Sequence, residues 1–203
     1  MSERLQHYFD TKLLAGKDQE TRFLEAYFDI RDLHFDCGRL PEKPRSVSDS
    51  NRILETYKRG SCTAKHYLLG SKLETLGFET RYLTFPFKWG DIQVSYPQDL
   101  KELADQMPIQ YHCALGLMSG DQGHLLDVTW DRELSKAGFV VNELLADNGQ
   151  DSLGVVPCGE TVLHQSAQQR WDYIQELKMQ MPRHEIVPIF YTELNQWLQS
   201  LRD

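Results

Sequence analysis

Residues 59–85 read RGSCTAKHYLLGSKLETLGFETRYLTF, which places a cysteine at the start of a predicted helix and a predicted strand directly after it. Over residues 62–76 the apolar side chains recur on one face at helical spacing, and Gly77 is a typical residue to end a helix. Residues 78–85 alternate in the manner of a strand and are rich in aromatic and β-branched types, so we expect a strand that ends at Pro86. The rest of the fold is predicted outward from this helix and strand.

Further along the chain, the pattern predicts a β-hairpin. Residues 109–118 and 124–129 are strand candidates, and the sequence SGDQG between them is rich in turn-forming residues. A short helix is expected over 98–107, ahead of the hairpin.

The segment before the cysteine is predicted to be mainly helical. Apolar periodicity predicts two helices over 5–36, with a break near 15–17. A proline-containing loop over 38–49 should lead into a helix that is capped by one of residues 48–50 and ends at Gly60.

The segment after the hairpin gives a weaker pattern. Residues 132–157 contain short apolar pieces among glycines and are expected to be rich in loops. Residues 166–181 and 192–201 predict two terminal amphipathic helices. Because no repeat or linker divides the chain, we expect one α+β domain over 1–203, with a core at 49–131 and helical extensions over 1–48 and 160–203.

Composition and charge narrow the function classes. The 203 residues are 40% hydrophobic and 26% charged, as in soluble globular proteins. Lys and Arg number 22 against 30 Asp and Glu, and the net charge of −8 would repel a nucleic-acid backbone. The amino-terminal sequence MSERLQHYFD carries charges where a secretory signal needs apolar residues, and no apolar run reaches the length of a membrane span. We therefore expect a cytoplasmic protein with no nucleic-acid or membrane partner.

The cysteine pattern does not predict disulfides or a metal site. The four cysteines are far apart and form no CxxC pair, so free thiols are expected; they are Cys37, Cys62, Cys113 and Cys158. A metal site built from His112, Cys113 and His124 lacks the usual ligand spacing. No cofactor or metal is expected.

Cys62 is the main candidate for chemistry. A thiol at the start of a helix lies near unpaired backbone N–H groups and the positive end of the helix dipole, and both stabilise a thiolate. Gly60 and Ser61 leave room beside the sulfur for a substrate carbonyl. The alternative is that Cys62 is a small buried hydrophobic residue, as most helical cysteines are.

A thiolate nucleophile needs an imidazole, and the imidazole needs an acceptor that orients it. If Ser119 and Gly120 form a two-residue turn, paired residue numbers sum to 239 and His112 lies directly opposite Asp127. A longer turn would make this contact diagonal. The alternative is that His112 and Asp127 are an ordinary strand histidine and a strand-end cap.

Two other histidines are weaker candidates for the base. His124 lies three residues from Asp127 in a strand and therefore points to the opposite face. His66 lies one helical turn after Cys62 but has no evident carboxylate to orient it.

Other residues near the predicted site have less defined roles. The Cys62 amide is expected to stabilise an oxyanion, with a second donor from the preceding segment such as Tyr57. Ser61 is a further candidate for substrate contact. Trp130 either lines an acyl pocket or belongs to the core. Cys113 follows His112 and should face the other side of its strand as a buried thiol.

These residues resemble the transglutaminase-like proteins. The run from Gly60 to Ala64, with the later segment 76–82 (LGFETRY), is similar to the cysteine helix and the LGxxxR strand of that family. The segment from His112 to Trp130 is similar to its histidine strand and D-x-T aspartate strand. The resemblance covers approximately residues 53–131 and depends on the order Cys, His, Asp.

The resemblance implies a papain-like fold, in which the cysteine helix packs against an antiparallel sheet and helices flank the core at both termini. It also implies that Cys62 is the nucleophile, His112 the base and acid, and Asp127 the residue that orients the histidine. The family often has aromatic residues where this chain has Thr63 and Cys113. No calcium loop or extra β-sandwich domain is seen in this sequence, so calcium-regulated cross-linking is not implied.

A weaker resemblance links the cysteine segment to arylamine N-acetyltransferases. The sequence has Ser61 and the segment 129–131 (TWD) where those enzymes have glycines, which argues against acetyl-CoA chemistry. The predicted function is acyl transfer or hydrolysis through a thioester, on a peptide, a protein or a small amide or ester. The alternatives are an acetyltransferase of this kind and a binding module without catalysis. The sequence leaves the oligomeric state open.

Overall fold

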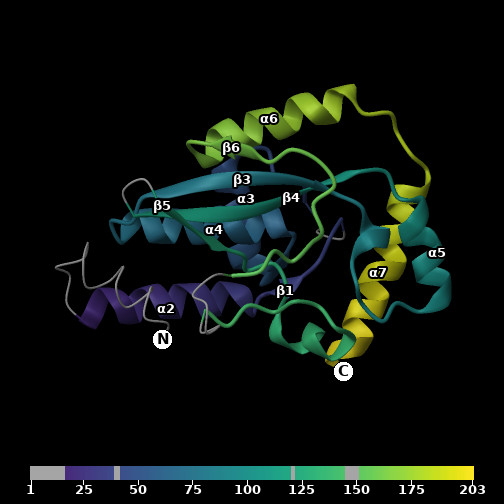
Figure 1. The fold of residues 1–203 in the computed structure, drawn as a ribbon, viewed down its shortest axis with the longest axis horizontal. Coiled ribbons are helices and arrows are strands. Elements are labelled where there is room, and N and C mark those ends of the chain that lie inside the picture. Colours follow the sequence, from purple (N-terminus) through teal and green to yellow (C-terminus); the bar gives the residue numbers. More distant parts are fainter. Residues whose placement is uncertain (1–16, 39–41, 120–121, 145–150) are drawn as a thin grey trace.

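A computed structural model describes residues 17–38, 42–119, 122–144 and 151–203. It confirms the α+β class (Figure 1). The helices are α2 (Lys17–Arg31), α3 (Val47–Tyr57), α4 (Cys62–Thr75), α5 (Gln98–Gln106), α6 (Ala167–Gln180) and α7 (Ile186–Arg202), with short 3₁₀ helices η1 (Trp89–Asp91) and η2 (Arg132–Ala137). The strands are β1 (His34–Phe35), β2 (Arg59–Gly60), β3 (Thr80–Phe87), β4 (Gln110–Ser119), β5 (Gln122–Leu126) and β6 (Val162–His164). The predicted helix before residue 16 lies outside the described residues.

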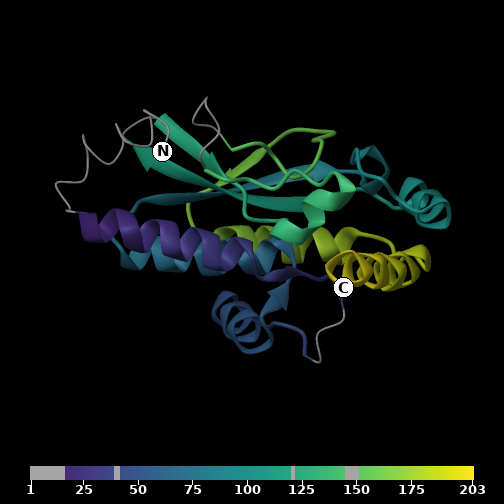
Figure 2. The same ribbon diagram turned by 90° about the horizontal axis from the view of Figure 1, so that it is seen from below.

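The central sheet is antiparallel and has the strand order β5-β4-β3-β6. Helix α4 packs on β4, α2 and α3 pack on α4, and α6 packs on β3. Figure 2 shows the sheet as one layer and α2 and α4 as part of a helical layer below it. The predicted packing of the cysteine helix against an antiparallel sheet is confirmed. Strand β6 and the short parallel pair of β1 and β2 were not predicted.

The β4–β5 hairpin forms, but its predicted register is wrong by two residues. Ser119 belongs to β4 and pairs with Gln122, so paired residue numbers sum to 241 and not to 239. Strand β5 ends before Asp127, which therefore approaches His112 diagonally. Because side chains alternate with a period of two, a shift of two residues keeps both side chains on the same face of the sheet. The predicted contact survives for this reason.

Strand β3 continues through Pro86, where we expected it to end. In an antiparallel ladder the N and the carbonyl of one residue face the same neighbouring strand. The Pro86 carbonyl accepts a hydrogen bond from the Cys158 N–H at 2.8 Å, so the proline nitrogen also faces that side and not β4. The pairing of Pro86 with Tyr111 on β4 loses no hydrogen bond.

Three helix boundaries also differ from the prediction. Ser46 caps α3, because its hydroxyl accepts a hydrogen bond from the Asp49 N–H at 3.1 Å. The helix ends at Tyr57, where Lys58 takes a left-handed conformation with φ 55°, and Gly60 lies in β2. Helix α7 begins at Ile186 and not near residue 192, since the proline in its first turn needs no helical acceptor.

The core consists of two clusters of buried apolar side chains. One lies between α2, α4 and the sheet, and the other contains Trp89, Trp130 and apolar residues of α5 and α7. Cys62 packs against both clusters, so it lies where they meet. None of the helices in the described part of the chain combines the length and the apolar composition needed to span a membrane.

Candidate active site

The chain before Cys62 is held rigidly. Strand β2 pairs in parallel with β1, with Phe35 opposite Gly60. A Cβ atom on Gly60 would lie only 3.0 Å from a methyl carbon of Leu54, so the backbone approaches α3 closely at this point. Ser61 is extended and Cys62 is the first residue of α4. The Cys62 N–H therefore belongs to the helix start, where N–H groups have no helical acceptor.

The environment of the Cys62 thiol favours the thiolate. Burial raises the pKa of this thiol, but a hydrogen bond from His112 and the charge of that ring lower it. The backbone N–H of Cys113 and the charge of Arg170 lower the pKa further. Together they hold the pKa of Cys62 below its ordinary value. Cys62 as a residue is half-buried and lines a pocket.

His112 lies on β4 between the sulfur and the carboxylate. Its Nε2 is 2.7 Å from an oxygen of Asp127, which leaves Nδ1 for the hydrogen bond with Cys62. Burial lowers the pKa of His112, but the charge and the hydrogen bond of Asp127 outweigh it and raise the pKa to about 10. The opposite shifts of the two pKa values favour a thiolate–imidazolium pair.

The Asp127 carboxylate is buried and is bound by three N–H groups. One oxygen accepts from His112 and from the backbone of Gly154, both at 2.7 Å, and the other accepts from the backbone of Thr129 at 3.0 Å. Burial raises the pKa of this carboxyl, but the charge of His112 and these hydrogen bonds outweigh it and hold the pKa well below its usual range. Asp127 therefore remains ionised at neutral pH.

His66 links the start of α4 to the segment after β5. Its Nε2 accepts the backbone N–H of Val128 at 3.1 Å, so the proton lies on Nδ1 and is donated to the Cys62 carbonyl at 2.7 Å. Burial is the largest effect on this ring and lowers its pKa to about 4. A neutral His66 thus connects the start of α4 to the segment that carries Asp127.

Lys65 ties α4 to the same segment. Its buried ammonium donates to the backbone carbonyl of Thr129 at 2.8 Å. Two further carbonyls, of Arg31 and Leu33, accept from it at 2.8 and 2.9 Å. The contact with Thr129 ties α4 to the chain after β5, and the other two tie α4 to the end of α2 and the residues that follow it.

Arg170 of α6 lies behind the cysteine and histidine. Its guanidinium is fully buried and donates to the hydroxyls of Thr63 and Tyr67 at 3.3 and 3.2 Å. It also approaches the backbone carbonyl of His112 at 3.4 Å. All three acceptors are uncharged and do not neutralise the guanidinium. Its positive charge lowers the pKa of the Cys62 thiol.

A pocket opens beside the sulfur. Its cavity volume is about 110 Å³. Cys62 and His112 both line it. Six aromatic side chains contribute to its wall: Phe35, Phe87, Trp89, Tyr111, Trp130 and Tyr191.

Some of the predicted site residues line the pocket and others do not. Ser61 and Trp130 line the pocket together with Cys62. Tyr57 does not: its hydroxyl contacts Glu42 at 3.4 Å, because α3 ends at this residue and directs the side chain away from the cysteine. Cys113 is fully buried, and burial raises the pKa of its thiol to about 12.

The sequence analysis missed Gly154 and Arg170 and did not predict the backbone contacts of His66. Gly154 lies in the segment expected to be loop-rich, and a Cβ there would lie 2.6 Å from the Trp130 indole nitrogen. Arg170 lies on a terminal helix more than 100 residues from Cys62. No sequence pattern connects these residues to the cysteine, whereas His66 had a signal in its spacing of four from Cys62.

A cysteine with a lowered pKa, a histidine beside it and a carboxylate hydrogen-bonded to that histidine are the groups that a cysteine-nucleophile site requires. No protein-family model and no curated protein matches the chain. Among solved structures, a Cytophaga hutchinsonii protein described as "a putative cysteine protease" matches with a TM-score of 0.37 and 15% sequence identity. The match covers 80% of this chain and 49% of that one, so the chain spans about half of its length. A likeness of this degree carries no argument about activity.

Proposed function

We propose that the chain is a cysteine-dependent acyl-transfer enzyme that acts on an amide or ester through a thioester. The observation that carries this proposal is that His112 is hydrogen-bonded to Asp127, lowers the pKa of Cys62 and lines one pocket together with it. The order of the three residues and the elements that hold them match what the resemblance to transglutaminase-like proteins implies. In this proposal the protein works in the cytoplasm, where its free thiols stay reduced.

In the first half of the reaction, the Cys62 thiolate attacks the substrate carbonyl carbon and a C–S bond forms. The developing oxyanion meets the Cys62 N–H at the start of α4. The bond from the carbonyl carbon to the leaving nitrogen or oxygen then breaks, and this atom takes the Nδ1 proton of His112. The products are a thioester on Cys62, a neutral leaving group and a neutral His112.

In the second half, water or an amine attacks the thioester. Neutral His112 takes a proton from this nucleophile as the new bond to the carbonyl carbon forms. The C–S bond breaks, and the thiolate–imidazolium pair is restored. Asp127 stays ionised throughout and stabilises the imidazolium at both stages.

Selective alkylation tests the proposal. At pH 6, iodoacetamide is expected to modify Cys62 ahead of the three other cysteines, because the surroundings of Cys62 stabilise a thiolate. A His112→Ala variant should lose this selectivity, with a rate lower by roughly tenfold for each unit by which the pKa rises. The measurement is site-resolved mass spectrometry of the alkylated peptides over time.

The matched control is His124→Ala, which removes a histidine from β5 that does not line the pocket. It should leave the alkylation rate of Cys62 unchanged. Equal modification of all accessible cysteines in the parent protein would contradict the enzyme proposal and favour a binding module.

The pH dependence gives a separate prediction. The alkylation rate should rise with pH through the lowered pKa of Cys62 and then stay level. Hydrolysis of an ester should decline again near pH 10, because His112 must hold a proton for the leaving group and its pKa is about 10. A stopped-flow series from pH 4 to 11 measures both, and a single rise centred on an ordinary thiol would contradict the ion pair.

A further inference from the structure

Six aromatic side chains line the pocket, and several of them pack on one another. The ring centroids of Phe35 and Trp130 are 4.5 Å apart, and those of Phe87 and Trp89 are 5.4 Å apart. Trp89 also packs on Tyr191 of α7, with centroids 6.1 Å apart. Such mutually packed rings form a rigid apolar surface that suits a flat apolar group.

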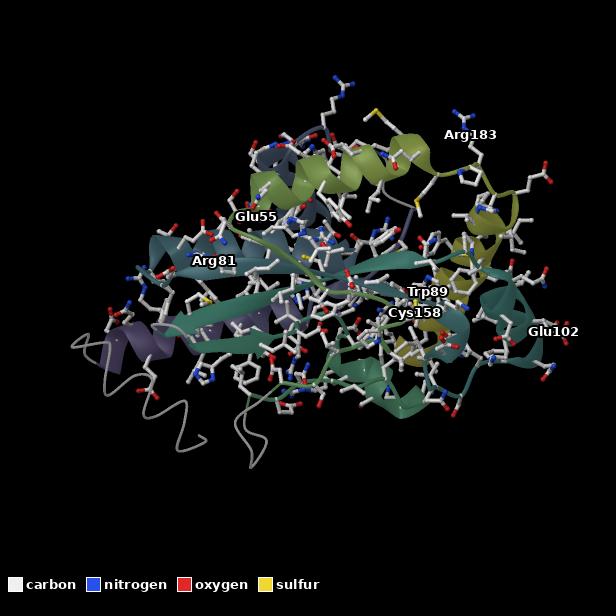
Figure 3. The ribbon with its side chains drawn as sticks, turned by 45° about the horizontal axis from the view of Figure 1, so that its top comes forward. Glu55, Arg81, Trp89, Glu102, Cys158 and Arg183 are labelled. Atoms are coloured by element: carbon white, nitrogen blue, oxygen red, sulfur yellow. The ribbon has the colours of Figure 1, made fainter. Side chains whose placement is uncertain are left out.

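The charged side chains lie elsewhere. Among the described residues, no Asp, Glu, Lys or Arg lines the pocket, and its only charges are those of Cys62 and His112. Figure 3 places Trp89 within the fold and the charged Glu102 and Arg183 at its periphery. A charged substituent in this pocket would lose its hydration without gaining a partner, so an uncharged group is favoured.

Two residues that line the pocket have a buried polar side-chain atom without a hydrogen-bond partner among the described residues: Trp89, at its indole nitrogen, and Thr129, at its hydroxyl. The Thr129 hydroxyl is buried and has no hydrogen-bond partner among the described residues, although Thr129 lines the pocket. Its backbone position is fixed, since its N–H donates to Asp127 and its carbonyl accepts from Lys65. A buried hydroxyl without a partner is costly, and a ligand with a hydrogen-bonding group would satisfy it.

We propose that this pocket binds an uncharged aromatic acyl group that carries a hydrogen-bonding substituent, with the aromatic wall holding the ring and Thr129 holding the substituent. This inference rests on the proposed function, because the carbonyl of the acyl group must reach Cys62. It names the class of acyl donor, which the catalytic residues alone leave open.

Three matched alkylating probes test the inference without requiring turnover. They are N-benzyl-, N-(4-hydroxybenzyl)- and N-(4-carboxybenzyl)-2-iodoacetamide, which differ at one position of the ring. Their rates at Cys62 are divided by their rates at Cys158, an exposed thiol of the same chain that does not line the pocket. This ratio removes differences in the intrinsic reactivity of the probes.

The benzyl probe is expected to give a ratio roughly 10- to 100-fold above that of iodoacetamide, as burial of an aromatic ring implies. The hydroxybenzyl probe should exceed the benzyl probe by about 3- to 10-fold. The carboxybenzyl probe should lose most of this advantage. A Thr129→Val variant should remove only the gain from the hydroxyl, and Thr129→Ser should restore it.

A second variant changes the wall. Tyr191→Glu introduces a carboxylate into the pocket and should abolish the preference for the benzyl probe. The matched control Tyr173→Glu changes a half-buried tyrosine of α6 that does not line the pocket, and it should keep the preference. If Cys62 is the reactive thiol but all probes give equal ratios, the inference fails and the enzyme proposal stands. If Cys62 shows no selective reactivity even with iodoacetamide, the enzyme proposal itself fails.

Discussion

An Asp127→Asn variant is expected to hydrolyse an aromatic acyl ester roughly 10²- to 10⁴-fold more slowly than the parent protein. The carboxylate accepts N–H groups on both oxygens, from His112, Gly154 and Thr129. An amide has one oxygen, so its NH₂ group must face at least one of these donors. The variant also loses the charge that raises the pKa of His112, and the thiolate loses its cationic partner. Steady-state kcat and the pH profile of Cys62 alkylation measure the two effects.

The matched control for this prediction is Asp131→Asn. Asp131 is also a buried carboxylate, but it pairs with Arg202 at 2.6 Å and not with an imidazole. Loss of this pair should lower the melting temperature while the midpoint of the Cys62 alkylation profile stays the same. If Asp127→Asn and Asp131→Asn reduce kcat equally, the effect of Asp127 is general destabilisation, and its role beside His112 is wrong.

The part of the site predicted from the sequence depends on local periodicity. Cys62 is recognised because apolar spacing and Gly77 bound a helix that begins at the cysteine. The side of the sheet that carries His112 and Asp127 follows from the parity of the hairpin register, which a two-residue error does not change. Both features can be predicted because they depend only on residues that are close in the sequence or that a single turn brings together.

The residues that the sequence analysis missed are far in the sequence from the site residues that they affect. Gly154 donates its N–H to Asp127 from an irregular segment, where no period marks one glycine among several. Tyr57 was expected to supply an oxyanion donor because it lies five residues before Cys62, but the left-handed turn at Lys58 separates the two. A loop or turn that sets the direction of a side chain leaves no periodic signal in the sequence.

An Arg170→Met variant is expected to raise the pKa of Cys62 and to lower its alkylation rate at pH 6 by roughly tenfold or more, since one pKa unit is a tenfold change in the thiolate. The guanidinium touches only uncharged acceptors, on Thr63, Tyr67 and His112, and its Nε has no partner among the described residues. These contacts do not neutralise the positive charge of Arg170, so this charge can stabilise the Cys62 thiolate. The rate is measured from pH 5 to 10 by site-resolved alkylation.

Two comparisons separate an electrostatic role of Arg170 from a structural one. Arg170→Lys retains the positive charge but loses the planar set of guanidinium N–H donors. It should therefore recover most of the Cys62 alkylation rate at pH 6, even if the variant protein is less stable. Arg31→Met removes another fully buried guanidinium, one that pairs with Asp32 and Glu143, and should leave the pKa of Cys62 unchanged. At pH 10, where the thiol ionises without help, Arg170→Met should react at nearly the parent rate. A rate that is low at every pH would mean that the variant distorts the site, and an unchanged profile would mean that the thiolate does not depend on α6.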